Sequence, residues 1–154
     1  SDIYQFTDLS DTLEPEKLAK VMNSYLSEMT VVALECGGTI DKFIGDAILV
    51  FFGDPDSRGE ANDAMACVEM ALRMQQRIDE LQDHWKKQSV TNGLKVRMGI
   101  TTGYCTVGNF GSNQRMDYTV LGKPVNLAAR LESLASPGEI LISNKTKRKK
   151  FNVC

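Results

Sequence analysis

The chain has 154 residues, of which 42% are hydrophobic and 25% charged, as expected for one globular domain with a core of its own. Its net charge of −2 argues against a general nucleic-acid binder, since such proteins are usually basic. No apolar run approaches the roughly 20 residues of a membrane span and no signal peptide is visible, so we expect this piece to be soluble and cytoplasmic. The 4 cysteines lack a CxxC pair, which suits a reducing compartment, and the single histidine excludes histidine-based triads.

Hydrophobic periodicity predicts strands interleaved with helices. Asp11 or Thr12 can cap a helix with an apolar face, which Gly37-Gly38 ends. Gly45-Asp46 separates two apolar runs, and glycine permits the positive φ of a two-residue hairpin turn. This mixture favours an α+β domain with a ferredoxin-like βαββαβ core, in which helices pack on one face of a mixed or antiparallel sheet. In chain order we expect a helix to about residue 36, strands at 39–44 and 47–52, a loop at 53–60, a helix at 61–87, a turn at 92–93, strands at 94–101, 104–107 and 118–121, a helix at 124–134 and a strand at 139–143.

The hairpin at 37–53 is the most informative segment. Its turn carries the carboxylate of Asp46, and a carboxylate on a rigid hairpin tip can hold a metal. Lys42 precedes the turn among apolar neighbours, where its ammonium group can contact a ligand. Taken alone, the segment is equally well an ordinary hairpin with a solvated aspartate.

Together with 1–10 and 115–132, this hairpin resembles the catalytic domain of class III nucleotide cyclases, in particular bacterial adenylate cyclases. The resemblance runs in order from Asp2 to about Ser143 and includes 103–111. Three ordered motifs are far more specific than any one of them. The resemblance implies the same ferredoxin-like core. It also implies conversion of ATP to 3′,5′-cyclic AMP and pyrophosphate by attack of the ribose 3′-oxygen on the α-phosphorus.

The resemblance also implies a site for two Mg²⁺ or Mn²⁺ ions. Asp2 and Asp46 match the family's metal carboxylates, and the backbone carbonyl of Ile3 matches a further ligand. Mg²⁺ often binds through one or two carboxylates plus substrate phosphates, so two aspartates suffice. Phe6 and Thr7 match the stretch that contacts the phosphates, although Phe6 equally suits the core.

Lys42 and Thr119 match the family's two base-reading positions. A lysine can donate to adenine N1, and a threonine hydroxyl can accept from the 6-amino group. Guanine N1–H would meet the lysine as donor against donor, which costs roughly 1–3 kcal/mol, so Lys42 favours ATP over GTP. The alternative for Thr119 is a plain β-branched strand residue. A threonine here also matches the subgroup of bacterial adenylate cyclases often stimulated by bicarbonate.

Asn126 and Arg130 are spaced i, i+4 and therefore share one helix face. By resemblance, Asn126 positions the ribose and Arg130 stabilises charge on the phosphorus in the transition state, a role that suits a permanently charged guanidinium. In this family one subunit supplies the aspartates and the other supplies the base-reading, ribose and arginine residues. One chain carries both sets here, so we expect a homodimer with two equivalent sites.

From the resemblance we expect residues 1–154 to be a single cyclase catalytic domain, with ends that look truncated relative to the family. Asp2 stands almost first, where the family has a full strand before it, and the basic run 145–150 stands where the family continues with further strands and a phosphate-binding lysine. The run is most simply a solvated tail; a phosphate or membrane-surface role is the alternative. Relatives often carry membrane or sensor domains elsewhere in the parent protein.

Other functions stay open beside an adenylate cyclase. One is a catalytically silent cyclase-like domain used for dimerisation or nucleotide sensing. Another is an unrelated ferredoxin-like binding module, and a guanylate cyclase is a variant of the first reading.

Overall fold

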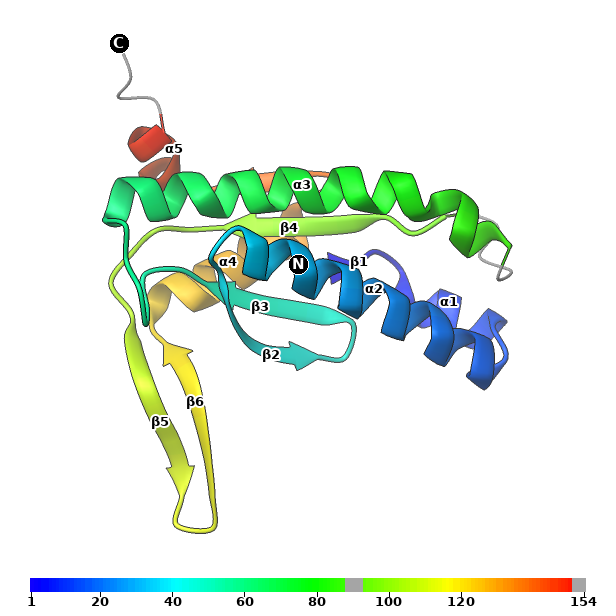
Figure 1. The fold of residues 1–154 in the computed structure, drawn as a ribbon, viewed down its shortest axis with the longest axis horizontal. Coiled ribbons are helices and arrows are strands. Elements are labelled where there is room, and N and C mark those ends of the chain that lie inside the picture. The colour runs from blue at the N-terminus through cyan, green and yellow to red at the C-terminus, as the bar shows by residue number, and fades with distance from the viewer. Residues whose placement is uncertain (88–92, 151–154) are drawn as a thin grey trace.

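A β-α-β-β-α-β succession forms the centre of the molecule (Figure 1). The structure is a computed structural model that describes residues 1–87 and 93–150. The succession confirms the predicted ferredoxin-like core and α+β class. It consists of β1 (Asp2–Ile3), α2 (Pro15–Glu35), β2 (Thr39–Ile44), β3 (Ala47–Phe51), α3 (Glu60–Lys86) and β4 (Val96–Ile100); the other elements are α1 (Phe6–Thr12), β5 (Thr106–Ser112), β6 (Arg115–Leu121), α4 (Lys123–Leu134), β7 (Ile140–Ile142) and α5 (Asn144–Lys150).

Strand pairing places the two ends of the core side by side. β1 pairs antiparallel with β4, with Asp2 opposite Arg97, and β4 pairs parallel with β7. The amide of Ile48 in β3 donates to the carbonyl of Ser1 at 2.9 Å, so the β2–β3 hairpin lies beside β1. Parallel and antiparallel pairing together make the sheet mixed, as predicted.

β4 separates two layers of helices because its side chains alternate between two faces. Val96, Met98 and Ile100 are buried in the core with α2 and α3. On the other face, Gly99 allows α4 to approach so closely that a Cβ there would lie 2.1 Å from the carbonyl oxygen of Ala128. Helices therefore pack on both faces of the sheet rather than on one, because β4 is buried on both sides.

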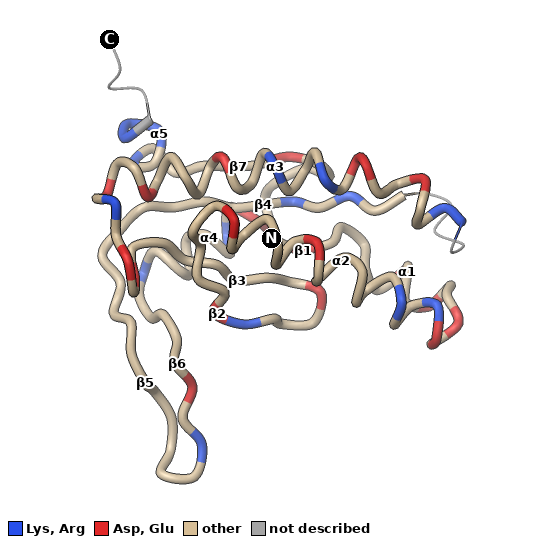
Figure 2. The backbone as a smooth tube through the Cα atoms, in the orientation of Figure 1, with Lys and Arg blue, Asp and Glu red and all other residues tan. Residues whose placement is uncertain are grey.

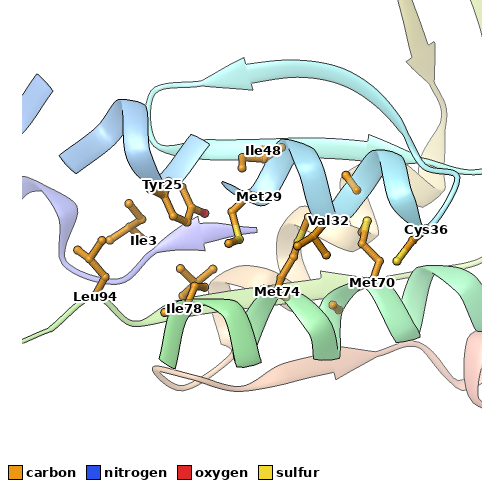
Figure 3. Close-up of a cluster of buried hydrophobic side chains, with 14 of the residues drawn as sticks. Ile3, Tyr25, Met29, Val32, Cys36, Ile48, Met70, Met74, Ile78 and Leu94 are labelled. Atoms are coloured by element: carbon orange, nitrogen blue, oxygen red, sulfur yellow. The ribbon is translucent and has the colours of Figure 1, made fainter. Parts of the chain in front are cut away.

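The main core lies between α2 and α3 (Figure 3). Tyr25, Met29 and Val32 of α2 point toward Met74 and Ile78 of α3, and Tyr25 and Met29 are fully buried. Burial of such side chains stabilises the fold by about 1.5–3 kcal/mol each. Most of the stability of these two helices therefore comes from their contact with each other and with the sheet.

The predicted start of the first long helix was wrong. Residues 11 and 12 belong to a separate helix, α1, and Leu13 leaves the helical conformation with φ −95° and ψ 142°. Pro15 then occupies the first turn of α2, where its missing N–H costs no hydrogen bond. A proline restricts the residue before it to extended conformations, and this separates the two helices.

The β5–β6 hairpin is longer than the sequence predicted and projects from the body of the molecule (Figure 1). Its register runs from Thr106 opposite Leu121 to Ser112 opposite Arg115. The charges of this hairpin lie on β6 and none on β5 (Figure 2). Buried and exposed positions do not alternate along these two strands. The sequence therefore has no amphipathic pattern that would predict the part of the hairpin farthest from the body of the molecule.

The basic run at 145–150 is a helix, α5, and not a solvated tail. Lys145 and Lys149 lie 3.1 and 3.0 Å from the two carboxylate oxygens of Glu60 at the start of α3. Thr146 is fully buried between them, and its hydroxyl lies 2.9 Å from that of Thr102. A lysine-rich run has no apolar period, so its contacts with Glu60, Thr102 and Ser143 were not predictable from the sequence.

Three remaining expectations concern the turn at 92–93, the cysteines and membrane-spanning helices. Gly93 of the predicted turn has φ 69°, whereas Asn92 lies outside the described residues. Cys36, Cys67 and Cys105 are free thiols. Among residues 1–87 and 93–150, no helix combines the length and apolar character needed to cross a bilayer.

Replacing Met29 by alanine should lower the free energy of unfolding by about 2–5 kcal/mol, since it removes a fully buried side chain and leaves a cavity. Met65→Ala on α3 is the matched control, because Met65 is 43% exposed and its loss should cost less than about 0.5 kcal/mol. Urea denaturation followed by circular dichroism measures both. Equal losses would contradict the assignment of Met29 to the core.

Candidate functional site

The two predicted metal carboxylates adjoin each other. Asp2 lies in β1, and Asp46 follows Gly45, whose φ of 63° forms the turn between β2 and β3. One carboxylate oxygen of Asp46 accepts a hydrogen bond from the amide of Ile3 at 2.9 Å. Burial, and then the neighbouring Asp2, raise the pKa of Asp46 to about 6. The structure thus brings Asp2, Ile3 and Asp46 together; their role as metal ligands stays a prediction.

These carboxylates suit a divalent cation. Two like charges at close range disfavour each other's ionised form, and a bound cation would remove that penalty. Within the described chain, no group of three or more histidine, cysteine, aspartate or glutamate residues is arranged to hold a metal. Mg²⁺ usually binds through one or two carboxylates and completes its shell with water and substrate phosphates, so two aspartates are compatible with such a site.

Arg97 is a part of this site that sequence reasoning missed. Its guanidinium lies 3.0 Å from Asp2 and 2.6 Å from Glu132 of α4, and all three side chains are mostly buried. Burial, and then the charge of Asp2, raise the pKa of Glu132. The only signal in the sequence was alternation in β4, where Arg97 stands between two apolar residues. Arg97 links β1 to α4 and partly balances the carboxylates.

Lys42 and Thr119 are brought together by a third residue, Asp41. The hydroxyl of Thr119 donates to Asp41 Oδ2 at 2.9 Å, and Lys42 Nζ lies 3.5 Å from the same oxygen. The backbone amide of Val120 donates to Asp41 Oδ1 at 3.1 Å. Thr119 is only 6% exposed, whereas the side chain of Lys42 is 42% exposed. Sequence reasoning missed Asp41, although it directly precedes Lys42.

Asn126 and Arg130 lie exposed on α4. In the part of the chain that the structure describes, neither side chain has a hydrogen bond or an ion pair, so both are available to a ligand or a second subunit. The helix that carries them is positioned by its close approach to Gly99 and by the ion pair between Glu132 and Arg97.

Phe6 and Thr7 lie at the start of α1, shortly after Asp2. Phe6 is half-buried and packs against the hydrophobic core, as the alternative reading of this residue expected. Thr7 is exposed, and its carbonyl accepts a hydrogen bond from the Ser10 hydroxyl at 2.7 Å. The role of both residues in phosphate binding stays a prediction.

A cavity of about 510 Å³ lies beside these clusters, lined by residues of β3, α3, β4 and α4, Glu132 among them. Its lining is mainly apolar and includes Ile48, Met70 and Met98. None of the predicted site residues lines it. The cavity adjoins the candidate site through Glu132, which pairs with Arg97.

Comparison with known proteins agrees with this arrangement. The family described as the adenylate and guanylate cyclase catalytic domain matches residues 1–151. The chain belongs to this family. This cyclase domain superimposes with a TM-score of 0.93 on the adenylyl cyclase CyaB from P. aeruginosa, at 53% identity over 96% of this chain and 76% of that one. The guanylyl cyclase Cya2 gives 0.89 at 40% identity, over 96% and 74% of the two chains.

Curated relatives are much longer than this cyclase domain. An adenylate cyclase of Anabaena cylindrica is 38% identical over 136 residues, which are 86% of this chain and 26% of the relative. Adenylate cyclase 1 of Rhizobium meliloti is 32% identical over 136 residues, 87% of this chain and 20% of the relative. The chain thus spans about a quarter of such relatives. The predicted resemblance to class III cyclases, close to bacterial adenylate cyclases, is confirmed; the subgroup with threonine and the cytoplasmic location stay predictions.

Replacing Arg97 by methionine should lower the free energy of unfolding by about 1–3 kcal/mol, because two largely buried carboxylates lose their cation while the apolar stem is kept. Arg115→Met is the matched control: Arg115 is 83% exposed and 3.8 Å from Asp117, so its loss should cost less than about 0.5 kcal/mol. Chemical denaturation at neutral pH without divalent cations measures both. A neutral Arg97→Met would mean that the carboxylates do not depend on this cation.

Proposed function

We propose that this domain is an adenylate cyclase, which converts ATP to 3′,5′-cyclic AMP and pyrophosphate at a site shared between two copies of the chain. The observation that carries the proposal is the adjoining pair Asp2 and Asp46, which repel each other and whose ionised form a divalent cation would stabilise. ATP is favoured by Lys42 and by the higher identity to an adenylyl cyclase than to a guanylyl cyclase. Guanylate cyclase and a catalytically silent sensor are the alternatives.

In this proposal the residues of the chain position ATP and stabilise charge. Asp2, Asp46 and the carbonyl of Ile3 would hold two Mg²⁺ or Mn²⁺ ions, which supply charge neutralisation for the triphosphate. Phe6 and Thr7 would contact the phosphates. Positioning and electrostatics then carry the reaction without a covalent enzyme intermediate.

The second set of residues would act on the nucleoside and the α-phosphate. Lys42 and Thr119 would contact adenine, and Asn126 would orient the ribose so that its 3′-oxygen faces the α-phosphorus. Arg130 would bind the α-phosphate oxygens as negative charge increases on them, while pyrophosphate leaves. Its exposure and its lack of a partner in the described chain are consistent with this role.

A second copy of the chain fits the surface around these residues. Apolar side chains are exposed on the strands that carry Lys42 and Thr119 and on the helix that carries Asn126. Contiguous exposed apolar surface commonly marks a protein interface. The exposed side chains are Phe43 (47% exposed) and Ile44 (61%) of β2, Met116 (59%) and Tyr118 (49%) of β6, and Leu127 (41%) of α4.

The purified domain should form cyclic AMP from ATP with Mg²⁺ or Mn²⁺ and little cyclic GMP from GTP, and EDTA should abolish both reactions because the carboxylates need a cation. Chromatographic separation of products measures this, with the oligomeric state determined in the same samples. An intact dimer that makes no product would favour the silent sensor. Preferential use of GTP would favour the guanylate cyclase.

Mixing two inactive variants should restore activity if the site is shared. Asp46→Asn removes one half of each site and Arg130→Ala the other, and the arginine change alone should lower kcat by about 10²–10³. A mixed dimer has one complete site and one doubly defective site, so random exchange of subunits should give roughly a quarter of the wild-type activity. Failure to regain activity, with exchange shown by tagged subunits, would argue against a shared site.

Bicarbonate should stimulate the enzyme if Thr119 places it in the subgroup discussed above. The measurement is cyclic AMP formation over a bicarbonate series at fixed pH, with chloride at matched ionic strength as the control. A flat response would refute this part of the proposal.

A further inference from the structure

Asp41 is the extra residue of a β-bulge in β2. Ile40 faces Val50 and Lys42 faces Leu49, so Asp41 has no partner on β3. Bulges occur often beside active sites, where they change the direction of a side chain. Here the Asp41 carboxylate contacts β6 instead of the hairpin partner, and its side chain is completely buried.

This buried carboxylate fixes the hydroxyl proton of Thr119. A carboxylate only accepts hydrogen bonds, so in the 2.9 Å contact the threonine hydroxyl has to be the donor. The second oxygen of Asp41 is taken by the amide of Val120 at 3.1 Å, which prevents the carboxylate from turning away. Thr119 is β-branched and 6% exposed, so its own side chain has little freedom to rotate.

We propose that Asp41 is a specificity-determining positioning residue. Because it holds the proton of the Thr119 hydroxyl, that hydroxyl can only accept, and not donate, a hydrogen bond at position 6 of a purine. This inference rests on the proposed function and on Thr119 contacting the base. An acceptor pairs with the 6-amino group of ATP, whereas the O6 of GTP or ITP presents a second acceptor. Two acceptors in contact leave a buried polar group unpaired, which opposes binding of the 6-oxo purines.

Asp41→Asn tests the inference with almost no change of shape. The asparagine carbonyl can still accept from Val120, and its amide group then donates to the Thr119 oxygen. The threonine proton is released and can donate to O6. The ratio of kcat/KM for ATP to that for GTP should fall on the order of tenfold, and the ratio for ITP should fall with it, because ITP shares O6 but lacks the 2-amino group.

Thr119→Val is an independent test, which keeps the shape and removes the hydroxyl. If the hydroxyl is an acceptor only, this change should lower kcat/KM for ATP on the order of tenfold, whereas kcat/KM for GTP and ITP should stay the same or rise because an unfavourable acceptor is removed. A hydroxyl free to donate would serve the 6-oxo purines as well. In the double variant, Asp41→Asn should have no further effect on the ratio, since no threonine proton remains to be released.

Asp117→Asn is the matched control, because Asp117 lies on β6 near Thr119 and its side chain is 60% exposed. Its ATP-to-GTP ratio should equal that of the wild type. Thermal unfolding and oligomeric state are measured for every variant, and if Asp41→Asn does not fold, Thr119→Val decides. Equal losses for all three nucleotides in Thr119→Val, or an unchanged ratio in folded Asp41→Asn, overturn the inference while the cyclase activity stands. A wild-type dimer that forms no cyclic AMP overturns both.

Discussion

The β2–β3 hairpin has to meet two distant parts of the chain at once, and the whole candidate site depends on this constraint. At its tip, Asp46 accepts a hydrogen bond from the amide of Ile3 in β1. In its first strand, the bulged Asp41 accepts hydrogen bonds from Thr119 and Val120 in β6. A regular strand would direct Asp41 at the same face as its neighbours two positions away, so the bulge is what lets one hairpin serve both clusters.

The position of α4 depends on a different pair of constraints. Gly99 provides the space, since any side chain there would meet the backbone of the helix. Glu132 provides the direction, because its ion pair with Arg97 connects α4 to the same arginine that contacts Asp2. The exposed face with Asn126 and Arg130 is thus oriented from the opposite side of the helix. Rigid elements that carry polar groups at defined positions are what preorganised electrostatic stabilisation requires.

Within one chain the two sets of proposed site residues are arranged on different elements: the carboxylates at the β1 edge, and the base, ribose and arginine residues on β2, β6 and α4. The elements that carry the second set also carry exposed apolar side chains. A surface of this kind is costly in a monomer and is removed from water when a second copy covers it. The same apolar contacts would therefore stabilise the dimer and complete the site.

The core elements and the types of site residue could be predicted from the sequence because they depend on neighbouring residues in the chain. The turn at Gly45 needs a positive φ, the apolar stripes of α2 and α3 have a helical period, and Asn126 and Arg130 must share a face because they are one turn apart. Ordered motifs identified the family. The effect of a single residue on an element boundary was harder to predict. The apolar pattern alone predicted one continuous helix, but the structure has two helices, and Pro15 begins the second.

Contacts between distant residues were decided only by the tertiary structure. Asp41, Arg97 and Glu132 carry no motif of their own, and their roles come from partners 35 to 95 residues away in the chain. The helix α5 and the outer part of the β5–β6 hairpin likewise lack a periodic signal. α5 is stabilised by its ion pair with Glu60, and β5 and β6 are stabilised by pairing with each other. The sequence by itself determined which chemical groups are present and which local turns and faces they occupy. Which carboxylate faces which donor was decided by the fold, since hydrogen bonds and ion pairs depend on the position of both partners.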